Sequence, residues 1–100
     1  MNNKSVKFTV KHSIEVFWDE ETKQFVGISK ELQYTGMGST PDEARDNTNK
    51  AVELALQWCA ENGTLEEVLK ESGYQIFEVD HQKVWDHREP IANFPAKVFV

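Results

Sequence analysis

Cysteine is nearly absent from this sequence of 100 residues, which contains only Cys59. A single cysteine excludes an intrachain disulfide and any zinc site built from four thiolates. Proline and glycine are also scarce, with three and five residues, and no internal repeat or Gly/Ser-rich linker divides the chain. Since eleven aromatic residues and a hydrophobic content of 39% supply enough apolar surface for one core, we expect a single folded domain over residues 1–100.

The sequence also lacks a long apolar run. Residues 1–4 are polar after Met1 and lead into a stretch in which polar and apolar residues alternate. Neither a signal peptide nor a membrane-spanning helix fits this pattern. We therefore expect a cytoplasmic protein that does not contact a membrane.

Basic residues are in the minority, eleven against seventeen acidic ones, for a net charge of −6. The acidity is concentrated in residues 31–80, where three basic and eleven acidic residues give −8, whereas residues 1–30 and 81–100 each carry +1. Binding to duplex DNA or RNA usually needs clustered Lys and Arg to neutralise phosphates. The acidic middle segment instead favours a basic protein as a partner.

The first part of the sequence is typical of β-strands. Apolar residues occupy alternate positions, which predicts either one half-buried strand or a strand with a bend near residues 12 and 13; they are Val6, Phe8, Val10, Ile14, Val16 and Trp18. The polar residues 19–23 indicate a turn, and residues 24–29 the returning strand of a hairpin. A third short strand is expected within residues 32–37, where Gly36 and Gly38 indicate a bulge or a close approach of another backbone.

A long helix is predicted from residue 41. Thr40 can accept the N–H of Glu43, Glu43 can reach back to the N–H of Thr40, and Pro41 suits the first helical position. Asn62 and Gly63 are typical of a left-handed helix end. Small or apolar residues recur at helical spacing and predict the buried face; they are Ala44, Thr48, Ala51, Val52, Ala55, Trp58 and Cys59.

The remaining sequence predicts a short helix that begins with a second capping box at residues 64–67 and stops at Gly73, followed by a strand over residues 74–79. Residues 81–95 show no regular period, and residues 96–100 can form a last strand. The expected fold is therefore α+β, a three-stranded antiparallel sheet with a long helix, a short helix and a further strand (β-β-β-α-α-β), in which residues 81–100 are a tail. The long helix packs on one side of a mainly antiparallel sheet.

No catalytic or metal-binding motif stands out, so we expect no cofactor, no metal and no enzymatic activity. Cys59 lies on the apolar helix stripe and is interpreted as a buried, inert thiol. His12 has the inward parity of its strand and is interpreted as a core or interface residue. The pairs Asp80-His81 and Asp86-His87 have ligand types that suit a transition metal, but two such pairs in a polar loop are more often solvated.

Three segments together resemble the HicB-like antitoxin family, over about residues 10–72. The resemblance rests on Glu31-Leu32 after the hairpin, on the capping turn Gly38-Ser39-Thr40 with Glu43-Ala44, and on Ala51-Val52-Glu53 in the helix. It implies a partial RNase H-like fold without nuclease activity, which binds and blocks a small, basic, RNA-cleaving toxin of the HicA type and associates with itself. Many members add a C-terminal DNA-binding element, but residues 74–100 show no helical period, so direct DNA binding is not expected.

Three hypotheses about function follow. The first is a non-catalytic, antitoxin-like binding module that uses an exposed strand edge and acidic contacts from the helix, at Asp42, Glu43, Asp46 and Glu53. The second is a stand-alone homo-oligomer, a dimer or larger, whose interface buries exposed aromatic side chains, at Phe17, Trp18, Trp85 and Phe94. The third is a degenerate metal-dependent nuclease, which needs carboxylates of the first strand and the helix to converge on two ions.

Overall fold

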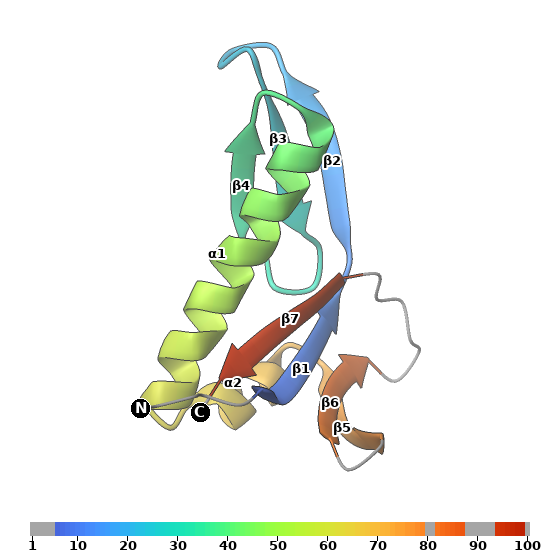
Figure 1. Cartoon of the computed structure of the whole chain (residues 1–100), viewed down its shortest axis with the longest axis vertical. Coiled ribbons are helices and arrows are strands. Elements are labelled where there is room, and N and C mark those ends of the chain that lie inside the picture. The colour runs from blue at the N-terminus through green and yellow to red at the C-terminus, as the bar shows by residue number, and fades with distance from the viewer. Residues whose placement is uncertain (1–5, 80–81, 88–93, 100) are drawn as a thin grey trace.

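The computed structural model of the chain describes residues 6–79, 82–87 and 94–99 (Figure 1). The elements follow in the order β1 (Val6–His12), β2 (Ile14–Asp19), β3 (Gln24–Ser29), β4 (Thr35–Gly38), α1 (Pro41–Glu61), α2 (Leu65–Glu71), β5 (Tyr74–Val79), β6 (Gln82–His87) and β7 (Phe94–Phe99). The α+β class is therefore confirmed, and the predicted strands at residues 24–29 and 74–79 have the expected bounds.

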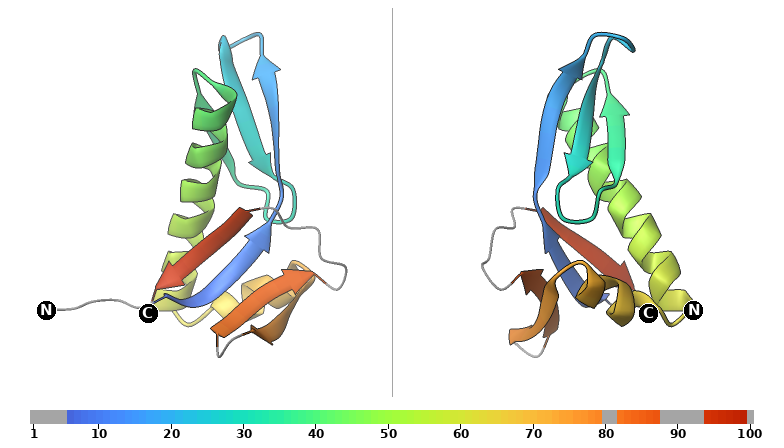
Figure 2. Two further views of the ribbon diagram at one scale, coloured as in Figure 1. Left: turned by 45° about the vertical axis from the view of Figure 1, so that its right-hand side comes forward. Right: turned by 180° about the vertical axis from the view of Figure 1, so that it is seen from behind.

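The strands form two sheets. One is three-stranded and antiparallel, in the order β2-β3-β4, as expected from the sequence. The other is four-stranded, in the order β5-β6-β1-β7, with β1 parallel to β6 and antiparallel to β7. The helix α1 runs along both sheets: it packs on β2, β3 and β4, and its later turns lie beside β7 (Figures 1 and 2).

The predicted first strand is divided at Ser13, because its two halves join different sheets. The carboxylate of Glu31 fixes this bend: it accepts hydrogen bonds from the backbone N–H and the hydroxyl of Ser13, both at 2.6 Å. A charged acceptor holds such short bonds strongly. Glu31, which belongs to neither strand, therefore fixes Ser13 as the position where the chain passes from one sheet to the other.

Glycines in the three-stranded sheet allow α1 to lie directly on it. A Cβ added to Gly36 would lie 2.6 Å from the carbonyl carbon of Asn47, and one added to Gly38 would lie 2.6 Å from the backbone nitrogen of Ala44. Both atoms belong to the helix backbone, which cannot rotate away as a side chain can. The expected close backbone approach is thus confirmed, and it shows which face of the sheet the helix covers.

The start of α1 agrees with the sequence in one bond and differs in another. The hydroxyl of Thr40 accepts the N–H of Glu43 at 3.1 Å, which confirms Thr40 as the N-cap. The carboxylate of Glu43 accepts the N–H of Ser39, not that of Thr40 as expected. The second predicted capping box is wrong, because the Thr64 hydroxyl makes no cap bond to α2 and instead donates to the carbonyl of Cys59 at the end of α1.

The main core lies between the four-stranded sheet and the two helices. Its buried members are Val10, Val52, Leu56, Cys59, Leu65, Leu69, Tyr74, Trp85, Ala96 and Val98. The helix stripe is partly different from the expected one: Leu56 is buried, whereas Trp58 is 62% exposed. Residues two positions apart in a helix point about 200° apart around the helix axis. Leu56 and Trp58 therefore cannot both face the core.

The C-terminal segment belongs to the fold. The last strand is confirmed, although it begins at Phe94, two residues earlier than predicted. The strand β6 was not expected, because Asp86 interrupts its apolar pattern, yet this residue is only 5% exposed. Since β6 and β7 pair with β1 on its two sides, they complete the four-stranded sheet.

Candidate protein-binding surface

The three-stranded sheet has one face on α1 and one face turned away from it. Gly27 faces the helix, since a Cβ placed there would meet Thr48. Side chains alternate along a strand and share a face across a pair. The pairing register therefore assigns to the other side, here called the open sheet face, the residues Glu15, Phe17, Asp19, Gln24, Val26, Ile28, Thr35 and Met37.

An apolar row crosses the centre of the open sheet face. Phe17 pairs with Val26, and Val26 pairs with Met37. Phe17 is 49% exposed and Met37 is 44% exposed. Within the described part of the chain, the elements that pack substantially on β2, β3 or β4 are their own neighbours and α1, and Figure 2 shows α1 behind this sheet when the open face is in front. Aromatic and Met side chains at the centre of a patch are typical of protein interfaces.

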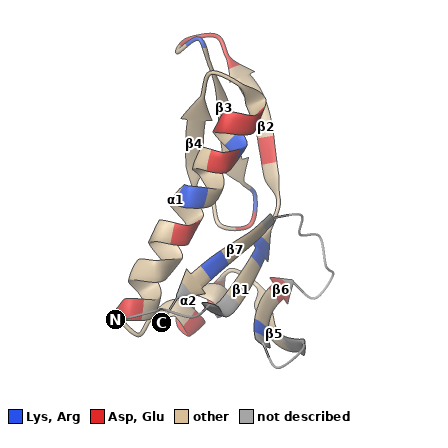
Figure 3. Ribbon diagram, in the orientation of Figure 1, with Lys and Arg blue, Asp and Glu red and all other residues tan. Residues whose placement is uncertain are grey.

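Acidic residues gather at the end of the molecule that contains the turn between β2 and β3 and the first turns of α1. The turn after β2 lies next to the start of α1, because Gly38, which precedes the helix, pairs with Phe25 at the start of β3. Figure 3 shows acidic residues, coloured red, in both segments. This acidic end contains Asp19, Glu20, Glu21, Asp42, Glu43 and Asp46, against two cations, Lys23 and Arg45, so its net charge is −4.

The four helix carboxylates proposed as partner contacts differ in what they already bind. Asp42 is paired with Arg45 at 2.6 Å, and Glu43 binds Ser39. Asp46 is exposed and makes no hydrogen bond or ion pair with the described residues. The carboxylate of Glu53 accepts the backbone N–H of Lys97 at 2.9 Å, so this residue attaches β7 to α1 and lies about two turns from the acidic end.

The four aromatic residues expected at an oligomer interface do not form one surface. Phe17 and its neighbour Trp18 point to opposite faces of the sheet, and Trp18 packs edge-on against Phe25 with its N–H bonded to Glu20. Trp85 is 2% exposed and belongs to the core, so its place in an interface was wrong. The side chain of Phe94 lies outside the described residues. Phe17 is therefore the aromatic side chain of this set that the open sheet face presents.

A buried polar cluster connects β1, β3 and α1. The ring of His12 lies 3.1 Å from the hydroxyl of Ser29 and 2.7 Å from the amide oxygen of Asn49. The amide oxygen only accepts, so Nε2 of His12 carries the proton and Nδ1 accepts from Ser29. Burial lowers the pKa of His12 below 6.5, although the bond to Asn49 and the charges of Glu31 and Glu53 act in the opposite direction.

This Ser–His–Asn connectivity resembles that of a nucleophilic triad, but its burial gives it a structural role. His12 and Ser29 are both 0% exposed, so a substrate cannot contact the hydroxyl in this structure. The interpretation of His12 as a core residue is confirmed. Its hydrogen bonds hold the bend between the two sheets against the helix.

Carboxylates are not brought together for metal-ion chemistry in residues 6–79, 82–87 and 94–99, where no group of three or more His, Cys, Asp or Glu side chains could hold an ion. Glu15 lies on the open sheet face, on the side of the sheet opposite α1. Asp80 and His81 lie outside the described residues, as does the side chain of His87. Cys59 is a free, buried cysteine, as expected.

Sequence reasoning did not find the open sheet face. Alternation in β2 and β3 shows that each strand has two faces, but not which face a helix covers. The signal was present in the glycines at positions 27, 36 and 38: a helix can lie close only where side chains are missing. The strand positions that alternate with these glycines therefore lie on the face of the sheet that the helix does not cover.

Comparisons with protein-family models, with curated proteins and with solved structures find no match to this chain. Neither described helix combines the length and the hydropathy that crossing a membrane requires.

Proposed function

We propose that this protein is a non-catalytic binding module, similar in role to a HicB-type antitoxin, that binds and blocks a small, basic, RNA-cleaving protein. The observation that supports it is the open sheet face, whose apolar row is not covered by any described element. On β2 the carboxylates of Glu15 and Asp19 flank this row, and it lies next to an end of the molecule with a net charge of −4. An RNA-cleaving toxin has a cationic surface, because it must bind phosphates.

The two parts of this surface have different tasks. The acidic end, with Asp42 and Asp46 on α1, attracts a basic partner and accelerates its association, because charge complementarity acts mainly on the rate of encounter. The apolar row supplies the contact that keeps the complex together, since a few central aromatic or apolar side chains carry most of the binding energy of an interface. The strands β2 and β4 form the edges of the sheet and can add backbone hydrogen bonds.

The test begins with a search for a gene of a small basic protein beside the gene of this chain, and the absence of such a gene rejects the proposal. The protein that such a gene encodes is purified together with this chain. We expect Phe17→Ala to weaken the complex at least tenfold in calorimetry and to restore RNA cleavage by the partner. Leu54→Ala is the matched control, because Leu54 is 73% exposed on α1, away from the open sheet face, and should leave the affinity unchanged. Equal affinities for the two variants, or no binding by the neighbouring protein, would reject the proposal.

The acidic end is tested separately by the association rate. Asp46→Lys reverses a charge that has no partner among the described residues. We expect it to lower the association rate constant several-fold at low salt and to have little effect at 0.5 M salt, where screening leaves only short-range contacts. Light scattering and nuclease assays of the isolated chain with Mg²⁺ or Mn²⁺ test the two alternatives: a stable dimer that Phe17→Ala dissociates, or cleavage of RNA by this chain, contradicts the proposed role.

A further inference from the structure

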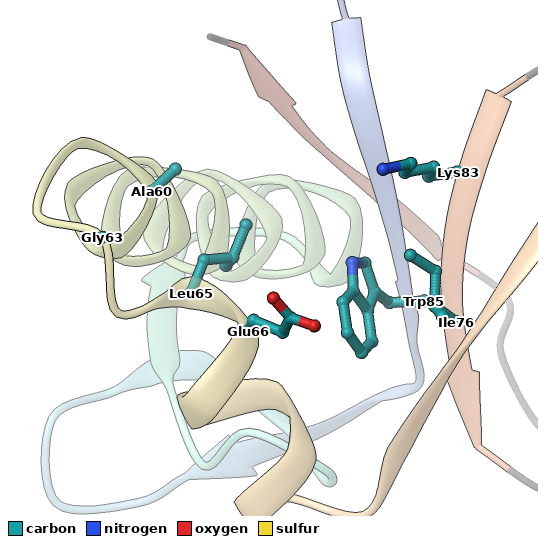
Figure 4. A pocket seen from close by; sticks show the side chains of 7 residues that line it. All are labelled: Ala60, Gly63, Leu65, Glu66, Ile76, Lys83 and Trp85. Atoms are coloured by element: carbon teal, nitrogen blue, oxygen red, sulfur yellow. The ribbon is translucent and has the colours of Figure 1, made fainter.

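A cavity of about 250 Å³ lies at the opposite end of the molecule from the acidic end. Ala60 and Gly63 at the end of α1, together with Leu65 and Glu66 at the start of α2, form one wall. The opposite wall belongs to the hairpin of β5 and β6 (Figure 4) and consists of Ile76, Lys83 and Trp85. An apolar cavity of roughly 150 Å³ suffices to bind benzene, so this one has room for an aromatic ring with a short polar chain.

The indole N–H of Trp85 has no hydrogen-bond partner and lies at this cavity. The residue is 2% exposed, and among the described residues its nitrogen is the one buried side-chain polar atom without a partner. Figure 4 shows this nitrogen on the side of the ring that faces α1 and α2. Native proteins satisfy nearly all buried donors, because a donor that loses water without gaining another acceptor destabilises the fold. The position of Trp85 therefore indicates an acceptor from beyond the described residues.

A cation accompanies this donor. Lys83 precedes Trp85 by two residues on β6, so its side chain leaves the same face of the strand and extends beside the indole in Figure 4. It is exposed and makes no ion pair with the described side chains. The carboxylate of Glu66 on the opposite wall is already paired with Lys70 at 3.3 Å. Glu78, which pairs with Lys83 in the register, has its side chain outside the described residues. Among the described side chains that line the cavity, the charge without an ion pair is therefore that of Lys83.

We propose that this cavity binds a small carboxylic acid with an apolar body. One carboxylate oxygen accepts the indole N–H of Trp85, and the ammonium group of Lys83 pairs with the carboxylate. The body of the ligand packs against the apolar side chains of Ala60, Leu65 and Ile76. The nitrogen of Trp85 has less than 1 Å² of exposed surface, so the carboxylate reaches it only after a side chain of the cavity wall moves. Glu66 is exposed and can turn away at little cost, while Lys83 stays to pair with the ligand.

Nuclear magnetic resonance tests this site through the indole N–H signals, because the chain has three tryptophans and each gives one signal. The probe is 3-phenylpropanoate. We expect it to shift the signal of Trp85 in a saturable manner and to leave those of Trp18 and Trp58 in place, since Trp18 donates to Glu20 and Trp58 lies on the exposed side of α1. The variants Trp18→Phe and Trp58→Phe assign the signals without changing a core residue.

Two comparisons make the test specific for the proposed contacts. The alcohol 3-phenylpropan-1-ol has the same body without the charge, and Lys83→Met keeps the apolar stem of the side chain without the ammonium group. Because a charge-assisted hydrogen bond is roughly twice as strong as a neutral one, each should reduce the affinity about tenfold. A signal of Trp85 that stays fixed up to about 10 mM probe, equal binding of the alcohol, or equal binding by Lys83→Met overturns the proposal. Magnetisation transfer from water to this N–H without any shift by the probe would show that a water is its only partner.

Discussion

Nε2 of His12 donates a hydrogen bond to the amide oxygen of Asn49 over 2.7 Å, and it does so where the chain leaves one sheet for the other. His12 is the last residue of β1, and Asn49 lies on α1, the helix that spans both sheets. A neutral imidazole satisfies both neighbours, because it donates to Asn49 and accepts from Ser29. Both hydrogen bonds, to Asn49 and from Ser29, therefore require the buried imidazole ring of His12 to be neutral.

Acid should destabilise the protein through His12. Burial lowers its pKa in the folded state below the ordinary value of 6.5, so between these two values the unfolded chain binds the additional proton. The free energy of unfolding is then fully retained above pH 6.5 and decreases as the pH falls through 6.5 toward the lowered pKa. Urea titrations between pH 8 and pH 5 measure it. Titration of the His12 ring by NMR must show the lowered pKa, and a ring that titrates at or above 6.5 contradicts the prediction.

A methyl group at position 36 should force α1 away from the sheet. In Gly36→Ala the new Cβ would meet the backbone of Asn47 and Thr48, and overpacking of this kind costs about 1–3 kcal/mol. Thr35→Ala is the control, because Thr35 is exposed on the same strand. Chemical denaturation should show the loss for Gly36→Ala only. Because Ala is a better strand former than Gly, unchanged or increased stability of Gly36→Ala would contradict the close contact with α1.

Truncation of Leu56 should lower the free energy of unfolding, whereas truncation of Leu54, two residues earlier on α1, should leave it nearly unchanged. Leu56 is 0% exposed in the core, so Leu56→Ala should lower the free energy of unfolding by about 2–5 kcal/mol. Leu54 is 73% exposed, and Leu54→Ala should change it by no more than about 0.5 kcal/mol. Thermal and urea unfolding check both. A substantial loss in Leu54→Ala would show that this side chain is covered in solution.

The bond between Glu31 and Ser13 should contribute measurably to stability. Glu31→Ala removes the acceptor of two hydrogen bonds at 2.6 Å, and the partly buried N–H of Ser13 loses its charged partner, a change worth about 1–3 kcal/mol. Glu21→Ala removes an equal charge from an exposed turn and should be neutral within about 0.5 kcal/mol. Equal effects of the two variants would assign the loss to net charge instead of to the bend.

Much of the local structure could be predicted from the sequence, because it depends on neighbours in the chain. Thr40 and Pro41 define the start of α1, and Gly63, with a φ of +73°, follows its end as expected. The hairpin of β2 and β3 follows from alternation around a polar turn. These signals act within a few residues, so no tertiary information is needed to interpret them.

The arrangement in space could not be predicted in the same way. The division of the first strand at Ser13 depends on Glu31, eighteen residues away in the sequence. The burial of Trp85 depends on its pairing with Val10, which lies near the other end of the sequence. The strand β6 was not predicted, because the charged residue Asp86 interrupts its apolar pattern. In the structure Asp86 is nevertheless buried. The open sheet face was missed for a related reason: alternation does not show which side a distant helix covers.

The position of β1 has a consequence for synthesis of the chain. This strand is made first, yet it lies between β6 and β7, which are made last. At 5–20 residues per second, a ribosome needs about 4–16 seconds to proceed from the end of β1 to the start of β7. During that time the three-stranded sheet and the first turns of α1 already have their own partners, whereas both edges of β1 and the later turns of α1 do not yet have theirs. The growing chain therefore completes one half early and closes the other half only when its final strand has emerged.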